Sequence, residues 1–71
     1  METEKLIAMA NQIGDFFEAY PSDAEAIQGI ANHLHSFWNS VMIHSIVAHV
    51  AQHQGAGLHP RVADAIKQHL A

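Results

Sequence analysis

The feature that most constrains the fold is the spacing of apolar residues, which recur at intervals of three and four along most of the chain. Residues at these intervals share one face of an α-helix, whereas a half-buried strand requires strict alternation. The spacing therefore predicts an all-α fold. Over 71 residues this gives a single helical domain, 1-71, built as a small antiparallel bundle of three to four short helices.

The first two helices are predicted on either side of a proline. Thr3 is the expected N-cap of the first, and Pro21 is expected to end it. Its apolar stripe comprises Leu6, Met9, Ala10, Ile13, Phe16, Phe17 and Tyr20. A capping box at residues 22–25 then predicts the start of the second helix. The second stripe comprises Ile27, Ile30, Ala31, Leu34, Phe37 and Trp38.

Two further helices are predicted in the second half of the chain. Asn39 or Ser40 is the expected cap of a third helix, and glycines in residues 54–57 predict its end and a loop. The third helix is expected to bury Ile43, Ile46, Val47 and Val50. Pro60 suits the first turn of a last short helix. The stripe of that helix comprises Val62, Ala63, Ile66 and Leu70.

Charge and hydropathy exclude two classes of partner. Three Lys and Arg against seven Asp and Glu give a net charge of −4, which repels the phosphate backbone of nucleic acid. No apolar run approaches the roughly 20 residues of a membrane span, and residues 1–5 do not resemble a basic signal-peptide start. We therefore expect a cytoplasmic protein with no nucleic-acid or membrane partner. The absence of cysteine fits a reducing compartment.

Seven histidines are unusual for a chain of this length. His49 and His53 lie four residues apart, a spacing that can place two ligands on one metal ion. No glutamate accompanies them in the pattern of a zinc protease, and no cysteine supplies a third ligand. They are weak metal candidates, and solvated helix-surface side chains are the favoured interpretation. Protonation of all seven would change the net charge from −4 to −4 + 7 = +3, so a pH-responsive protein is an alternative.

The sequence shows no constellation for catalysis. The serines at positions 36, 40 and 45 lie in helical pattern, without the strained glycine elbow of a serine nucleophile. No glycine-rich loop follows a strand, so neither a dinucleotide fingerprint nor a P-loop is present. We predict no catalytic residue and no cofactor-binding residue on this chain.

Aromatic side chains are concentrated in two adjacent pairs, Phe16-Phe17 and Phe37-Trp38. Neighbouring residues lie about 100° apart on a helix, so burying both members of a pair requires a wide apolar face. Either all four fill one small core, or one member of each pair anchors a partner. Asn11 and Asn32 lie beside these faces, where their amides either bond another protein or link helices of this chain.

The residues around these pairs carry a resemblance to a known family. They are Met-Ala-Asn-Gln-Ile at 9–13, Phe-Phe at 16–17, Gly-Ile-Ala-Asn-His-Leu at 29–34 and Phe-Trp at 37–38. Together with Gly-Ala-Gly-Leu at 55–58 and the proline that follows, the chain resembles the delta subunit of cytoplasmic NAD-dependent formate dehydrogenases. The resemblance covers nearly the whole sequence.

This resemblance implies a non-catalytic small subunit that stabilises assembly or cofactor loading of a large catalytic subunit, which oxidises formate to carbon dioxide. It implies no cofactor on this chain. Bis-molybdopterin guanine dinucleotide with molybdenum or tungsten, iron-sulfur clusters, FMN and NAD belong to the large subunit and its flavin and iron-sulfur partners. A free-standing histidine-rich metal-binding protein and a homo-oligomeric adaptor are the alternatives.

One segment departs from the family pattern. Family members often follow the Phe-Trp pair with a proline and basic residues around a methionine, whereas residues 40–43 here are Ser-Val-Met-Ile. The departure implies a more apolar contact surface at this point. The predicted partner interface comprises Asn11, Phe16, Phe17, Asn32, His33, Phe37, Trp38, Val41 and Met42.

Overall fold

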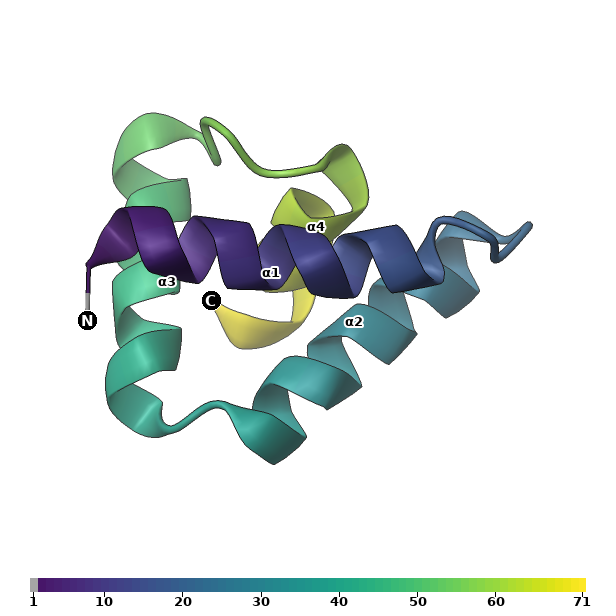
Figure 1. Cartoon of the computed structure of the whole chain (residues 1–71), viewed down its shortest axis with the longest axis horizontal. Coiled ribbons are helices and arrows are strands. Elements are labelled where there is room, and N and C mark those ends of the chain that lie inside the picture. Colours follow the sequence, from purple (N-terminus) through teal and green to yellow (C-terminus); the bar gives the residue numbers. More distant parts are fainter. Residues whose placement is uncertain (1) are drawn as a thin grey trace.

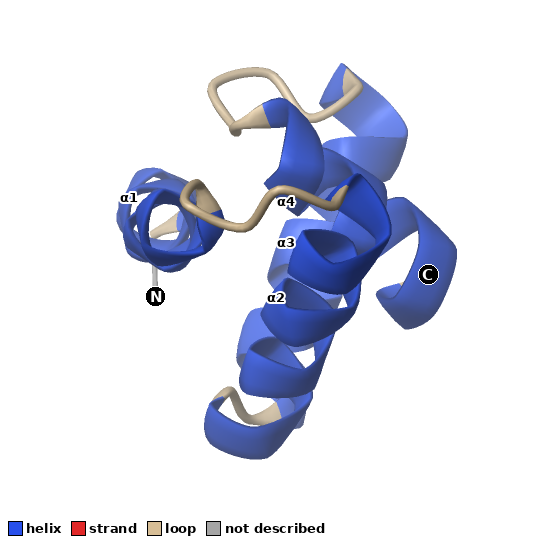
Figure 2. Cartoon of the chain, turned by 90° about the vertical axis from the view of Figure 1, so that its right-hand side faces the viewer, coloured by secondary structure: helices blue, strands red, loops and turns tan. Residues whose placement is uncertain are grey.

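A computed structural model describes residues 2–71. It contains four α-helices and a closing π-helical segment: α1 (Thr3–Phe17), α2 (Asp23–Phe37), α3 (Ser40–His53), α4 (Pro60–Ala65) and η1 (Ile66–Leu70). In Figure 1, α1 crosses in front of the other helices, and Figure 2 shows it nearly end-on beside them. The described residues form no strand. The predicted class, a small all-α bundle, is confirmed.

The core draws fully buried side chains from every element. Its largest members are Leu6, Ile30, Leu34, Ile46, Val62 and Ile66. No polar or charged residue is buried among the described residues. The accessible surface is 4337 Å², close to the roughly 4,400 Å² expected for a compact monomer of 7.8 kDa. The chain therefore closes a core without borrowing a surface from another protein.

Local signals set the starts of α2 and α3, but not of α1. The Ser22 hydroxyl accepts from the Glu25 amide at 3.3 Å, and the Asn39 side chain accepts from the Met42 amide at 2.9 Å. The prediction that Thr3 caps α1 is wrong. Thr3 is already the first helical residue, and the N-cap position belongs to Glu2, whose side chain makes no cap hydrogen bond.

The Asn39 cap gives a test of how α3 is held at its start. Asn39→Ala removes the side-chain oxygen that satisfies the Met42 amide, so we expect the free energy of unfolding to fall by about 1 kcal/mol. Ser40→Ala is the matched control, because Ser40 lies inside the helix and should change stability by less than about 0.5 kcal/mol. Urea denaturation followed by circular dichroism measures both. Equal effects of the two substitutions would contradict the cap assignment.

The end of α1 differs from the expectation based on Pro21. The helix ends at Phe17, so Tyr20 lies beyond it and is 38% exposed instead of extending the buried stripe. Arg61, from α4, donates from Nη1 to the carbonyl oxygens of Phe17 at 2.9 Å and Tyr20 at 3.0 Å. A long-range side chain thus satisfies carbonyls at the end of α1, ahead of the proline.

Two glycines let helices approach closely. A Cβ at Gly14 of α1 would lie 2.6 Å from Cγ2 of Val62 in α4. A Cβ at Gly29 of α2 would overlap the ring of Phe17 from α1. Both positions are helical, where glycine costs about 1 kcal/mol relative to alanine. The close contacts explain why glycine is nevertheless accommodated there.

Candidate protein-docking groove

The most exposed large apolar side chains of the described residues lie in the predicted interface. Phe16 is 70% exposed, Phe37 is 74% exposed and Val41 is 68% exposed. Phe16 lies on α1, Phe37 ends α2 and Val41 opens α3, so three elements contribute. An isolated exposed apolar residue is ordinary, whereas a contiguous exposed apolar patch is typical of a binding surface. Phe16 and Phe37 line the depression described next, and Val41 lies outside its lining.

A groove with a volume of about 510 Å³ lies between α1, the end of α2 and the start of α3. We call it the aromatic groove, and its lining comprises Met9, Gln12, Ile13, Phe16, His33, Phe37, Trp38 and Met42. Five of these lining residues belong to the predicted interface: Phe16, His33, Phe37, Trp38 and Met42. The lining contains no Asp, Glu, Lys or Arg. The depression is therefore largely apolar, with two polar side chains.

Each aromatic pair is divided between surface and interior. Phe16 and Phe37 are exposed, whereas Trp38 is only 7% exposed and belongs to the core cluster. Phe17 is half-buried over Gly29 and does not line the aromatic groove. The hypothesis that all four rings fill one core is wrong. The chain instead keeps one ring of each pair for its own packing and exposes the other.

His33 and Asn32 are adjacent on α2 but have different surroundings. The His33 ring lies 4.6 Å from that of Phe37, centroid to centroid, and lines the aromatic groove. Asn32 is exposed outside the groove lining, and its side-chain oxygen accepts from Gln28 at 3.0 Å. Only His33 is placed where an occupant of the groove would meet it.

Asn11 holds the loop before α4 against α1. Its amide nitrogen donates to the Gly57 carbonyl at 2.8 Å, and its oxygen accepts from the His59 backbone amide at 2.9 Å. Beside it, the His59 ring nitrogen Nε2 lies 2.7 Å from Asp15 Oδ1. The Asn11 amide was expected either to bond another protein or to link helices of this chain, and the structure shows it linking segments of this chain. Asn11 does not line the aromatic groove.

The two metal candidates, His49 and His53, lie together on α3 with ring centroids 5.4 Å apart. His49 Nε2 is 2.7 Å from the carbonyl oxygen of Ala56, which can only accept a hydrogen bond, so this nitrogen carries the proton and is not available as a ligand. Residues 2–71 contain no group of three or more His, Asp or Glu side chains placed to hold a metal ion. The geometry gives the pair no third ligand.

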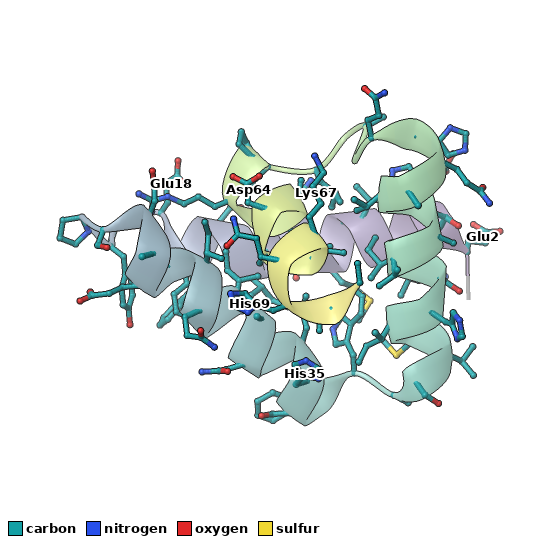
Figure 3. All side chains as sticks on the ribbon, turned by 180° about the vertical axis from the view of Figure 1, so that it is seen from behind. Glu2, Glu18, His35, Asp64, Lys67 and His69 are labelled. Atoms are coloured by element: carbon teal, nitrogen blue, oxygen red, sulfur yellow. The ribbon has the colours of Figure 1, made fainter. Side chains whose placement is uncertain are left out.

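The face seen in Figure 3 carries polar side chains from α4 and η1. Figure 3 labels Asp64, Lys67 and His69 there, with His35 of α2 nearby. His35 Nε2 lies 3.4 Å from the His69 carbonyl oxygen, which ties the end of the chain to α2. Another, smaller depression of about 410 Å³ lies between α3 and the end of η1, and its lining comprises Ser40, Ile43, His44, Val47, Leu70 and Ala71.

Among the described helices, none has the length and apolar composition needed to cross a membrane.

Sequence reasoning missed three lining residues of the groove: Met9, Gln12 and Ile13. The periodicity places Met9 and Ile13 on the buried stripe and gives Gln12 no role beyond the family motif. All three precede Phe16 at helical spacings and so share its side of the helix. Knowing that Phe16 is exposed would have identified this side of α1 as part of the surface. Its exposure depends on how α1 packs on the other helices, which the sequence pattern does not show. Arg61 was missed altogether, because its partners lie 38 to 44 residues away.

Comparison with known protein families finds a match, over residues 5–66, to the family described as NADH-dependant formate dehydrogenase delta subunit FdsD. The matched residues include α1, α2, α3 and α4 almost completely, and therefore the whole aromatic groove. Searches of curated proteins and of solved structures return no match.

Proposed function

The chain belongs to the NADH-dependent formate dehydrogenase delta subunit family, and from this premise we propose that it is a non-catalytic subunit docked on the large catalytic subunit. The observation that carries the proposal is the aromatic groove, where Phe16 and Phe37 stay exposed although the core is closed without them. Binding is the function that such a surface supports, because exposed aromatic rings supply large contact area at low entropic cost.

The chemistry of the side chains supports an accessory role. Iron-sulfur clusters are held mainly by cysteine thiolates, and this sequence contains no cysteine. His33 is the one titratable side chain of the groove lining, and no carboxylate in that lining accompanies it as an acid-base partner. Formate oxidation with NAD, bis-molybdopterin guanine dinucleotide holding molybdenum or tungsten, iron-sulfur clusters and FMN are assigned in this proposal to the other subunits of a cytoplasmic complex.

Purification of the tagged chain from its own cells, at near-physiological salt, tests the proposal. We expect mass spectrometry to find the large formate dehydrogenase subunit with its flavin and iron-sulfur partners, and elemental analysis to find molybdenum or tungsten. An untagged strain, carried through the same column, is the control. Recovery of this chain alone, zinc-loaded or self-associated, would contradict the proposal and support a metal-binding protein or a homo-oligomer.

Removing the chain separates the two roles that an accessory subunit can have. In a deletion strain, a stabilising role predicts that the other subunits come apart on gel filtration while the large subunit keeps its metal content. A role in cofactor loading predicts the opposite: the subunits stay together, and the metal content of the large subunit falls. An assembled, fully loaded and equally active complex without this chain would exclude both roles.

A further inference from the structure

The aromatic groove offers an occupant almost nothing to hydrogen-bond. Along α1 and up to His33 of α2 its walls are helical, and the main-chain groups there are paired within the helices. Main-chain groups without an intrahelical partner are confined to the α2–α3 junction, where the Asn39 side chain already takes the Met42 amide. The described chain has no strand edge to extend. Gln12 and His33 are the only polar side chains in the lining. Over most of the groove, a bound segment therefore loses water from its own backbone without receiving replacement hydrogen bonds.

For an extended segment, this desolvation costs free energy at each buried amide and carbonyl group. An α-helix avoids the cost because its backbone groups are hydrogen-bonded to one another. We propose that the aromatic groove receives one amphipathic α-helix of another formate dehydrogenase subunit. This inference rests on the proposed function and specifies the kind of surface that docks. Such a helix places residues at positions i, i+3 or i+4, and i+7 into the groove, between Phe16 and Phe37.

The charge of the groove sets the composition of the docking face. The chain carries seven Asp and Glu residues, none of which lines the groove, and Lys and Arg are absent from the lining as well. A charged residue on the facing side of the partner helix would therefore be desolvated without a counter-ion in the lining. A neutral, apolar face complements the groove.

A second copy of this chain is a poor occupant, because it has no unpaired amphipathic helix to place in the groove. The apolar faces of the helices of a second copy are already occupied by its own core.

Photo-crosslinking in the purified complex tests the helix directly. A photoreactive phenylalanine analogue, introduced at Phe16 or at Phe37, keeps an aromatic ring at the rim of the groove. We expect crosslinks to one segment of one other subunit, at residues three, four or seven apart. Crosslinks at alternate residues, crosslinks scattered over several loops, or crosslinks to a second copy of this chain would each overturn the inference.

Substitutions give a second, independent measurement. With the double variant Phe16→Ala/Phe37→Ala, we expect binding to the remaining subunits to weaken at least 30-fold, about the loss of one interface hot spot. Tyr20→Ala is the matched control, since Tyr20 is an exposed aromatic outside the groove lining and should leave binding unchanged. Unaltered helical content by circular dichroism shows that both variants fold.

The two proposals fail in different ways. If the wild-type chain retains no other formate dehydrogenase subunit, the proposed function is wrong. If the wild-type chain and the double variant retain the other subunits equally well, the chain is a subunit but the aromatic groove is not where it docks.

Discussion

Trp38→Ala is expected to lower the free energy of unfolding by about 3–5 kcal/mol, the usual cost of truncating a large buried aromatic side chain. The side chain of Trp38 is 7% exposed and packs in the main core cluster. A 71-residue domain has a total stability of only about 4–11 kcal/mol, so this change alone removes a large share of that stability.

Phe37→Ala is the matched control, because it removes a ring at the adjacent position. Phe37 is 74% exposed and its ring contacts that of His33, so we expect a change below about 0.5 kcal/mol. Urea denaturation followed by circular dichroism at 222 nm suits both variants, since it does not depend on tryptophan fluorescence. If the two substitutions destabilised the chain equally, the division of this pair between core and surface would be wrong.

Arg61→Ala is expected to cost about 2–3 kcal/mol of folding stability, in the range of hydrogen bonds made by a charged group. Nη1 of Arg61 donates to the carbonyl oxygens of Phe17 and Tyr20, and its Nε donates to Asp23 Oδ1 at 2.8 Å. The Arg61 side chain is only 21% exposed, so these bonds are largely shielded from water. Without them, the end of α1 loses its link to α4.

Two controls separate the carbonyl contacts from the ion pair. Asp23 is 77% exposed, and Asp23→Ala should cost less than about 1 kcal/mol, as for other surface ion pairs. Lys67→Ala, an exposed cation on the same C-terminal segment, should have an effect within about 0.5 kcal/mol. A loss as large for Asp23→Ala as for Arg61→Ala would show that the ion pair, and not the carbonyl contacts, stabilises this junction.

Features that depend on neighbouring residues were predictable from the sequence. Ser22 and Asn39 cap their helices, Pro60 opens α4, and the spacing of apolar residues identified the helices. Thr3 failed as a cap because the first helical turn includes it. Choosing between two adjacent candidates requires the backbone geometry of the first turn, which the residue types alone do not fix.

Features that depend on packing were not predictable in the same way. The apolar spacing predicts that both Phe16 and Phe17 are buried, but only Phe17 packs against another helix, with its ring against Gly29 of α2. The division of Phe37 and Trp38 has a similar origin, because α2 ends at Phe37 and Trp38 turns into the core from an extended conformation. Five of the nine predicted interface residues nevertheless line one groove, because the aromatic residues lie at the ends of the apolar stripes and His33 and Met42 lie near them.

The contacts of Arg61 have a consequence for the order of events during synthesis. Arg61 joins α4 to segments made 38 to 44 residues earlier, at Phe17, Tyr20 and Asp23. At about 5–20 residues per second, the ribosome needs roughly 2–9 s to make the residues in between, whereas a helix forms within about a microsecond. The end of α1 therefore acquires its native contacts with Arg61 only seconds after α1 itself has been made.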